Sequence, residues 1–467
     1  MDSALLFRPI RELSFRLRRR EISPVELTEL SLERLETLGS KTNAVVRTLR
    51  DRALIEAREA ERDITSGRYR GPLHGIPYGA KDLLATRGVP TTWGAAPYRD
   101  QVFDYDAAVI ERLRAAGAVL VAKLSMVELA GGMGYDHADA AFNGPGLNPW
   151  NTAFWSGGSS SGPGSAVAAG LVSFAIGSET SGSILTPSAF CGVTGLRPTY
   201  GLVSRYGAMA LAWTLDKLGP MAHTTDDCAL VLAAISGADP RDESSLKRRF
   251  EYTERAPSMK RPRLGVPKGC VEEVQPAVRE QFERGLAVLA RTCDVTRGVE
   301  WPDLPWNEAV SAIVAAEGAT AFHVLIESGR VHELRCPADR VNAYSKLMTP
   351  AVDYLQAMRA RKPMKRAVGA LFERFDAIVS PTRASVAYPA NQKFADVYPG
   401  LKGGPPLIAA GTLCGLPALA MPSGFGENGL PTSIALMGPA FSERVLVELG
   451  KTFQAATDWH TKRPPAA

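Results

Sequence analysis

The sequence SGGSSSGPGS at residues 156–165 has the composition of a flexible linker, because glycine and serine dominate linkers that stay solvated. It is followed directly by AVAAGLVSFAIG at residues 166–177, which is small, apolar and uncharged. A linker would join two differently composed units, whereas this stretch runs straight into a buried element. Buried hydroxyls and backbone groups need hydrogen-bond partners. We therefore expect residues 156–165 to form a packed loop of the core.

The composition is that of an ordinary globular chain. It has 467 residues, of which 45% are hydrophobic and 22% charged, with a formal net charge of +5. A charge this dilute argues against nucleic acid or a membrane surface as partner. Six scattered cysteines without a C-x-x-C pair argue against a zinc site or a disulfide framework. Because no signal peptide or long apolar segment is visible, we expect a cytoplasmic protein without metal or cofactor.

Helical and strand patterns alternate along the chain. SPVE at residues 23–26 is a capping box with proline at the first helical position, and leucines at helical spacing predict a helix to about residue 38. An amphipathic stretch at residues 106–117 ends in glycine and runs into an apolar strand at 118–123. The same alternation recurs at 171–176 and 375–380. These patterns predict an α/β fold.

Three later segments bear on domain organisation. Residues 239–263 are charged and contain proline, which is typical of a surface linker. Residues 264–374 are mostly helical in pattern, and we interpret them as an addition to one α/β body. Residues 415–438 predict two strands around a GENG turn. We expect one domain over residues 1–467.

Three motifs compete for the role of catalytic nucleophile. GSSSG at residues 158–162 fits the G-x-S-x-G elbow and would select Ser160, but that elbow follows a strand, and NPWNTAFW at 148–155 is predicted to be a loop. Ser244 and Lys247 fit S-x-x-K in the charged linker, where a nucleophile would stay solvated. The third motif, GSETSGS at 177–183, lets N–H groups of small residues converge on one point, as in an oxyanion hole. Phosphate binding there is less well supported, because no G-K-[ST] follows.

A nucleophilic serine needs a base. The six histidines offer no obvious partner, whereas Lys81 lies in the otherwise apolar run LHGIPYGAKDLL at residues 73–84. Burial would lower the pKa of this lysine and leave it neutral. The alternative is an ion pair between Lys81 and Asp82 at a strand end. The spacing alone does not separate the two interpretations.

Several segments together resemble the amidase signature family. The main ones are LHGIPYGAKD, GGSSSG and GSETSGSILTPSAFCGVTGLRPTYGLVSRYG, which start at residues 73, 157 and 177. The likeness covers about residues 65–240 and resumes at DAIVSPT and the closing ATDWHTKRPP, so it mainly omits residues 264–374. It implies a single three-layer α/β/α domain with a mixed central β-sheet, whose core is about 65–240 and 375–467.

The family pattern implies a Ser-Ser-Lys triad. By position, Lys81 is the base, Ser159 is the bridging serine on a cis peptide bond, and Ser183 is the nucleophile. Ser183 would give its proton through Ser159 to neutral Lys81 and attack the amide carbonyl, and water would later clear the acyl-enzyme. The backbone N–H groups implied to hold the oxyanion are those of Thr180, Ser181, Gly182 and Ser183.

The sequence departs from the family pattern beside the predicted nucleophile. The family usually has Asp at Glu179, Gly at Ser181, Arg at Leu185, and Gly-Gly-Ser at residues 161–163, which read SGP here. Losing that arginine removes the cationic half of an acid–base pair with Glu179. We therefore expect a repacked floor without a cation that could anchor an anion.

The loop GGMGYDHADAAFNGPG at residues 131–146, which includes Phe142, is predicted to face the substrate. The predicted substrate-binding residues are Gly132, Met133, Gly134, Tyr135, Trp155 and Ser160. Apolar and aromatic groups favour neutral aryl or long-chain amides, with some activity on esters and carbamates. Malonamate and free glutamine should be poor substrates. The alternative that these side chains belong to the core stays open.

We therefore predict an amidohydrolase that acts on a small-molecule amide, ester or carbamate as a monomer or homodimer. The alternative is the glutamine-handling A-type subunit of a tRNA-dependent amidotransferase, which LRPTYGLVSRYG at residues 196–207 also resembles. Such a subunit works with partner chains, and as we interpret its pattern, it carries a Ser/Thr-rich run where this chain has residues 131–146. A binding protein without catalysis is disfavoured, because all three triad positions are filled.

Overall fold

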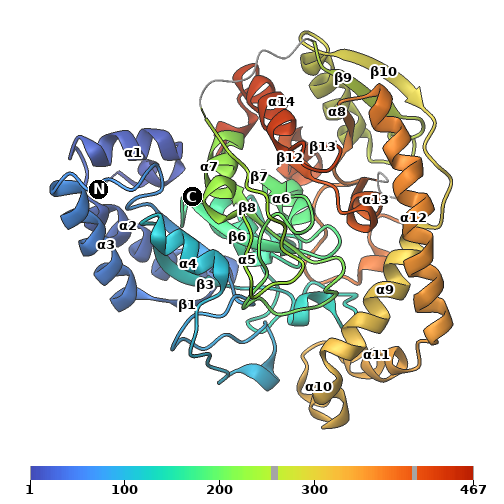
Figure 1. The fold of residues 1–467 in the computed structure, drawn as a ribbon, viewed down its shortest axis with the longest axis horizontal. Helices are drawn as coiled ribbons and strands as arrows, with labels where there is room; N and C mark the ends of the chain where they lie inside the picture. Colours follow the sequence, from blue (N-terminus) through green and yellow to red (C-terminus); the bar gives the residue numbers. More distant parts are fainter. Residues whose placement is uncertain (1, 254–260, 402–406, 466–467) are drawn as a thin grey trace.

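A large mixed β-sheet runs through the computed structural model, which describes residues 2–253, 261–401 and 407–465 (Figure 1). Its strands are β1 (Val45–Thr48), β2 (Pro77–Lys81), β3 (Val119–Leu124), β6 (Phe174–Glu179), β7 (Thr194–Arg197), β8 (Lys217–Ala222), β9 (Arg263–Pro267), β10 (Asp294–Val299), β11 (Ala377–Pro381), β12 (Ala418–Phe425) and β13 (Pro431–Met437). Their order is β1-β3-β2-β6-β8-β7-β12-β13-β11-β9-β10. Strands β3, β2 and β6 are parallel, whereas β6, β8, β7, β12 and β13 alternate in direction. The predicted mixed sheet is confirmed.

Helices cover both faces of this sheet. They are α1 (Ile10–Arg18), α2 (Pro24–Thr37), α3 (Arg50–Thr65), α4 (Ala108–Ala115), α5 (Ser161–Ala168), α6 (Leu185–Cys191), α7 (Thr225–Ile235), α8 (Pro276–Leu289), α9 (Trp306–Ala321), α10 (His323–Glu327), α11 (Pro337–Leu347), α12 (Ala351–Arg374), α13 (Leu407–Cys414) and α14 (Glu443–Ala455). Side chains alternate between the faces along each strand. In β3, Leu120 joins the core beneath α4, α7 and α14, whereas Val119 and Val121 join the core beneath α5. The α/β/α layering is confirmed.

Local sequence signals position several elements as predicted. The Ser23 hydroxyl accepts the Glu26 N–H at 3.1 Å, and the Glu26 carboxylate accepts the Ser23 N–H at 2.8 Å, so the capping box starts α2. Helix α4 ends just before Gly117, whose φ of 81° suits glycine, and the chain enters β3. Strands β12 and β13 flank the GENG turn. Strand β6 begins three residues later than predicted.

The prediction of a loop at residues 148–155 is wrong. Strands β4 (Leu147–Asn148) and β5 (Asn151–Trp155) pair there as a small antiparallel sheet. Asn148 Nδ2 donates to the Phe190 carbonyl at 2.7 Å, and Trp150 Nε1 donates to the Cys191 carbonyl at 2.8 Å. These bonds tie the hairpin to α6, which lies about 40 residues further along the chain. Local pattern contains no signal for such a contact.

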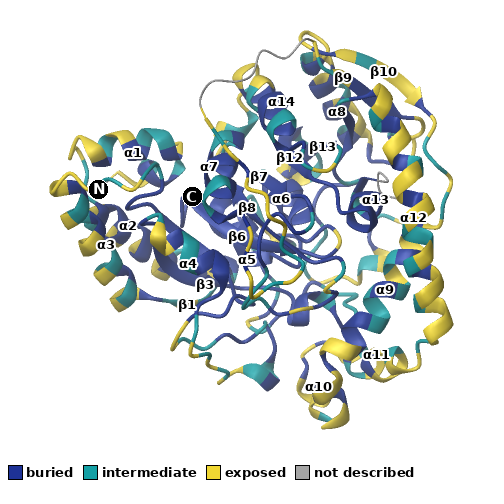
Figure 2. Ribbon diagram, viewed as in Figure 1, coloured by how far each residue is buried: buried dark blue, intermediate teal, exposed yellow. Residues whose placement is uncertain are grey.

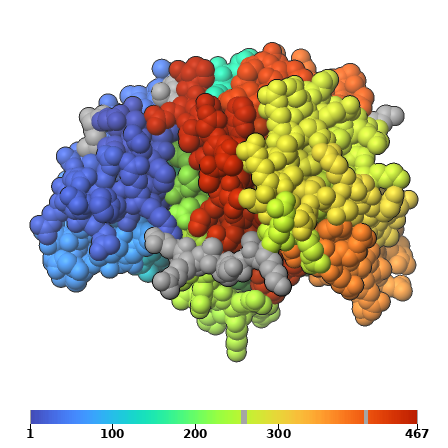
Figure 3. Space-filling view, turned by 90° about the horizontal axis from the view of Figure 1, so that it is seen from above, coloured from blue at the N-terminus to red at the C-terminus, as the bar shows by residue number. Residues whose placement is uncertain are grey.

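The segment 264–374 is mostly helical, as predicted, but it also extends the sheet. Strand β9 pairs in parallel with both β11 and β10, so the segment adds two strands at one edge. Seen from above, the C-terminal part of the chain, in red, lies between the N-terminal helices in blue and this segment in yellow (Figure 3). Of the linker predicted at 239–263, residues 254–260 lie outside the described residues, and Phe250 is buried rather than on the surface.

Residues 156–165 are buried throughout, as their surroundings predict, but residues 161–165 form the start of helix α5 and only 156–160 are a loop. A Cβ atom at Gly162 would lie 2.4 Å from the Ser125 nitrogen and 2.5 Å from the Ala44 oxygen, so only glycine fits. The Gly158–Ser159 peptide bond is cis, as the family resemblance implies. All six cysteines are free and buried, and no described helix is long and apolar enough to cross a membrane.

Candidate active site

Lys81, at the end of β2, is completely buried and contacts two serines. Its Nζ lies 2.8 Å from Ser159 Oγ and 2.9 Å from Ser178 Oγ. Burial lowers the pKa of Lys81 to about 7, although the Asp216 and Glu179 carboxylates act in the opposite direction. At neutral pH a large fraction of this amine is therefore unprotonated and able to accept a proton.

Asp82 does not pair with Lys81. Its carboxylate lies 3.1 Å from Lys123 Nζ and accepts the N–H and the hydroxyl of Thr92 at 3.0 and 2.5 Å. Successive residues of a strand point to opposite faces, so Lys81 and Asp82 diverge where β2 ends. Asp82 thus forms its ion pair with Lys123 and not with Lys81. Lys81 is therefore free to contact the serines.

Ser183 follows β6 in a short loop beside Lys81 and Ser159. The Ser160 N–H donates to the Ser183 carbonyl at 3.3 Å, which holds the two serine-bearing loops together. In the described residues, no hydrogen bond joins the hydroxyls of Ser159 and Ser183. Ser183 is 6% exposed and, with Thr180 and Ser181, lines a cavity of about 410 Å³. The predicted nucleophile is therefore buried but accessible from this cavity.

The backbone around Ser183 offers free donors. The N–H groups of Ser181, Gly182 and Ser183 donate no hydrogen bond to any described residue of the chain. Gly182 has a φ of 82°, a conformation that glycine adopts without strain. Unpaired N–H groups in a loop of this kind can hold a developing negative charge. This is the arrangement that an oxyanion hole needs.

Neither of the two competing serines, Ser160 and Ser244, forms a hydrogen bond with a lysine or histidine within the described residues. The Ser160 hydroxyl donates to the Ser178 carbonyl at 3.1 Å and accepts the Ser178 N–H at 3.3 Å, so it fastens α5 to β6. The strand β5 that precedes it belongs to the small hairpin and not to the main sheet. Ser244 hydrogen-bonds Asp242 and Arg205, whereas Lys247 is exposed. Neither the G-x-S-x-G motif at Ser160 nor the S-x-x-K motif at Ser244 therefore forms the arrangement of nucleophile and base that such a motif predicts.

Three buried residues of this site were missed or misjudged from sequence. Ser178 is the second partner of Lys81, and only its place in GSETSGS pointed to it. Glu179 has not lost its cation, because Arg197 Nη1 lies 2.7 Å from Glu179 Oε1 with both side chains completely buried. Despite its burial, Glu179 has a lowered pKa because Arg197 and Lys217 are near. The expectation that Glu179 lacks a cationic partner is therefore wrong, although Arg197 is engaged with Glu179 and does not line the cavity that contains Ser183.

Glu179 also organises the loop after Ser183. Its Oε2 accepts the N–H groups of Ile184 and Leu185 at 2.9 and 3.0 Å, where helix α6 begins. Asp216 supports the other side, since it accepts the Thr180 hydroxyl at 2.6 Å. Two buried carboxylates thus hold the segment that carries the unpaired N–H groups.

The structure divides the predicted substrate residues into two sets. Gly134 and Tyr135 line the 410 Å³ cavity, but Gly132, Met133, Trp155 and Ser160 do not. Met133 is 1% exposed, and Trp155 stacks on Phe394 at 4.7 Å in an aromatic cluster. These side chains belong to the core, the alternative that the sequence left open. Phe142 lies under the Arg99 guanidinium instead.

The cavity contains a charge that the sequence did not predict. Its walls are mainly apolar and come from Leu211 and from Val310, Val314 and Ala315 of α9. Lys346 of α11 lines it as well, and its Nζ donates to the Gly132 carbonyl at 2.6 Å. Helix α11 belongs to the segment outside the family resemblance, so no motif placed this lysine.

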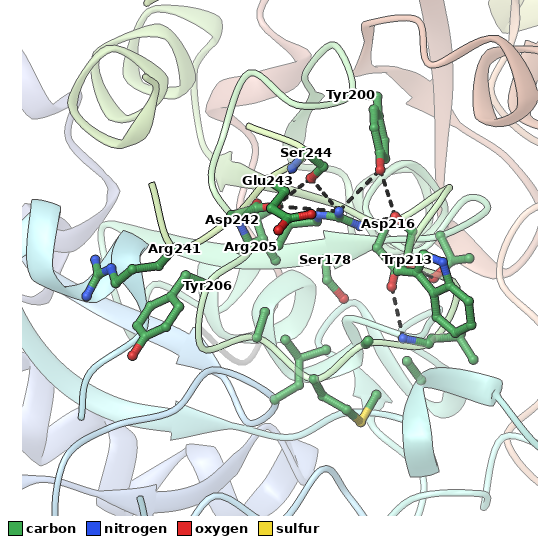
Figure 4. Close-up of a pocket in the computed structure, with 18 residues that line it drawn as sticks. Ser178, Tyr200, Arg205, Tyr206, Trp213, Asp216, Arg241, Asp242, Glu243 and Ser244 are labelled. Atoms are coloured by element: carbon green, nitrogen blue, oxygen red, sulfur yellow. Dashed lines mark hydrogen bonds and ion pairs between the residues drawn. The ribbon is translucent and has the colours of Figure 1, made fainter. Parts of the chain in front are cut away.

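A second cavity of about 430 Å³ adjoins the first and shares Ala130, Thr180 and Leu211 with it. Ser178 lines this second cavity, so the cavity reaches the serine that Lys81 contacts. Arg205, Asp242, Glu243 and Ser244 gather at one side of it (Figure 4). Arg205 lies 3.8 Å from Asp242 and donates to the Trp213 carbonyl, so its charge is already engaged.

One group of described residues has the ligand types of a metal site. Asp136, His137 and Cys336 place ligand atoms within 4.8 Å of one another. His137 Nδ1 is already 2.8 Å from Asp136, and Lys393 forms an ion pair with the same carboxylate at 3.3 Å. None of the three lines the cavity that contains Ser183.

The chain is similar to known proteins over nearly its whole length. A family model described as Amidase matches residues 26–447. The A-type subunit of the glutamyl-tRNA(Gln) amidotransferase of Methylococcus capsulatus is 37% identical over 97% of this chain and 98% of its own.

Solved structures are similar over nearly the whole chain. The native peptide amidase of Stenotrophomonas maltophilia has a TM-score of 0.85 and 31% identity, and each chain is covered to 98%. A chain from a structure described as an unexpected vestigial protein complex that reveals the evolutionary origins of an s-triazine catabolic enzyme has a TM-score of 0.87 and 29% identity, over 96% of this chain and 98% of that chain. The chain therefore belongs to the amidase family of amidase signature enzymes.

Proposed function

We propose that this enzyme hydrolyses carboxylic amides through an acyl-enzyme on Ser183. The observation that carries the proposal is the buried contact of 2.8 Å between Lys81 Nζ and Ser159 Oγ next to Ser183. The Ser183 Oγ attacks the carbonyl carbon while its proton passes through Ser159 to Lys81. The same relay protonates the leaving nitrogen, and water then releases the acid. The N–H groups of residues 180–183 hold the oxyanion.

The cavity supports a small substrate with an apolar portion. Its volume of about 410 Å³ lies near the lower end of the roughly 300–1,000 Å³ that is usual for ligand sites. Leu211, Val310 and Val314 support an alkyl or aryl group there, whereas the sequence prediction of such a group rested on other residues. Lys346 argues against a preference for purely neutral substrates. Esters and carbamates would develop the same oxyanion, so we expect some activity on them.

A second candidate is the amidotransferase A-type subunit that the sequence also suggested. It is favoured by the 37% identity to a protein of that name over almost the full length. In that case the enzyme would use glutamine as the amide and depend on partner chains. A stand-alone hydrolase is favoured by the higher TM-score of the peptide amidase, 0.85 against 0.77 for the amidotransferase A-type subunit of Thermotoga maritima.

The location, the cofactor requirement and the oligomeric state follow from the same two candidate functions. We propose a cytoplasmic enzyme with a small-molecule substrate and no cofactor, which acts as a monomer or homodimer if it is the hydrolase. No nucleic-acid or membrane partner is needed for hydrolysis.

The deciding experiment assays the purified chain alone. Acid release and amine or ammonia release are measured for primary amides, aryl amides, esters, carbamates and glutamine. Turnover of amides that Ser183→Ala abolishes supports the hydrolase. Inactivity on all amides except glutamine, or activity only after the other chains of an amidotransferase are added, supports the second candidate.

A further inference from the structure

Lys346 is the only charged side chain among the described residues that line the cavity containing Ser183. It enters from α11, while Ser183, Ser181 and Thr180 form part of the wall. Ala130, Leu211 and residues of α9 form apolar parts of the same wall. A substrate bound with its carbonyl at Ser183 therefore shares one cavity with an ammonium group.

This ammonium group is incompletely compensated. Within the described residues, its one hydrogen bond goes to the Gly132 carbonyl, and no carboxylate lies within ion-pair distance. An ammonium group has three donors, so two remain for a ligand. Burial lowers the pKa of Lys346 to about 8, which leaves it mostly protonated at pH 7.

The acid Asp339 compensates this charge only in part. Asp339 lies two turns earlier in α11 and is completely buried. Burial and the nearby Glu128 carboxylate raise the pKa of Asp339, so part of the population carries no charge at neutral pH. Lys346 is half-buried, so water compensates only part of its charge, and an anionic ligand would compensate more of it.

We propose that Lys346 binds a carboxylate on the acyl part of the substrate, so that the enzyme prefers monoamides of dicarboxylic acids to neutral amides. This assignment rests on the proposed function, because it takes Ser183 as the point of attack. It replaces the expectation that anionic acyl groups are poor substrates. The apolar parts of the wall would contact the methylene chain that separates the amide from the carboxylate.

Matched substrate pairs test the assignment. Succinamate, glutaramate and adipamate are compared at pH 7 with butyramide, pentanamide and hexanamide, in which a methyl group replaces the carboxylate. For at least one length, we expect kcat/KM to be roughly tenfold or more higher for the charged member. Lys346→Met should lower this ratio by at least about tenfold, and Lys346→Arg should keep more of it because the charge remains.

A purely structural role for Lys346 predicts a different result. If the lysine only ties α11 to the Gly132 carbonyl, Lys346→Met lowers kcat/KM for both members of each pair in parallel. That outcome overturns the proposal, as does a wild-type enzyme that shows no preference for any charged member.

Binding measurements separate this proposal from the proposed function. Succinate and glutarate are titrated by calorimetry into Ser183→Ala and into the double variant Ser183→Ala/Lys346→Met. Affinity that falls by about tenfold or more with the second substitution supports the anion site even if no amide is turned over. Equal affinities, or no binding by either variant, overturn it.

Discussion

Strands β2 and β6, which lie beside the predicted triad, and the helical segment that completes the cavity differ in how tightly their side chains are confined. Every residue of β2 and β6 is buried, whereas Val324 in α10 and Met348 after α11 are both 80% exposed. Figure 2 shows the same contrast between β6, in dark blue, and the largely yellow α10. In the strands, each residue must fit neighbours on all sides, so few sequences are allowed. In the helices, one face is fixed and the other is free. Sequence motifs can therefore predict the residues of the reaction, but they do not predict the residues that select the substrate.

The largest effect should follow from substitution in the confined region. We expect Ser183→Ala to lower kcat/KM by roughly a thousandfold or more, and Lys81→Ala by nearly as much, because no other described group can replace the nucleophile or the base. Turnover of a neutral amide is the measurement, and circular dichroism checks that both variants fold.

Ser159 and Ser160 provide a matched control for this prediction. The Ser159 hydroxyl contacts Lys81 Nζ, whereas, within the described residues, the Ser160 hydroxyl bonds only the backbone of Ser178. Ser159→Ala should therefore be much the more damaging of the two. An active Ser159→Ala beside an inactive Ser160→Ala would revive the G-x-S-x-G interpretation.

The sequence predicted what depends on local pattern or on a specific motif. The capping box at residues 23–26 and the turn at 427–429 follow from short-range spacing, and the places of Lys81, Ser159 and Ser183 follow from the family motifs. The partners that were missed come from elsewhere in the chain. Arg197 reaches Glu179 from the strand two positions across the sheet, and Lys346 depends on where α11 packs. Neither contact has a local sequence signal.

Arg197 offers a way to test the confined region by stability. Arg197→Met would leave the Glu179 charge buried without its ion pair, and Lys217 forms no ion pair with Glu179 within the described residues. Breaking a buried pair in this way costs about 3–5 kcal/mol. We expect a decrease of that size in the free energy of unfolding, measured by urea titration.

The double variant Glu179→Gln/Arg197→Met is the control for that measurement. It should be less destabilised than Arg197→Met, because no lone carboxylate remains in the core. A loss below about 1 kcal/mol for Arg197→Met would mean that the pair contributes no more than a surface pair does.

The pH dependence of turnover should show a smaller, graded effect. Lys81 acts as a base only when neutral, and burial lowers its pKa to about 7 from the ordinary value of 10.5. The assay uses a neutral amide, so that the charge on Lys346 does not affect substrate binding. Its kcat/KM should fall by about tenfold per pH unit below 7 and level off above it. A flat profile between about pH 5.5 and 8.5, under conditions where chemistry limits the rate, would argue against lysine as the base.

The smallest effect is expected in the exposed part of the variable segment. In α8, Arg284 Nη2 lies 2.5 Å from Glu280 Oε1, but the two side chains are 63% and 57% exposed. Water and salt screen such a pair, and exposed pairs one helical turn apart contribute about 0.3–0.5 kcal/mol. Alanine has the highest helix propensity, so the Arg284→Ala substitution offsets part of the free energy lost with the ion pair. We expect the free energy of unfolding in urea and the rate of turnover to remain within error of wild type. A decrease of more than about 1 kcal/mol in the free energy of unfolding would contradict the difference between the buried strands and the exposed helices.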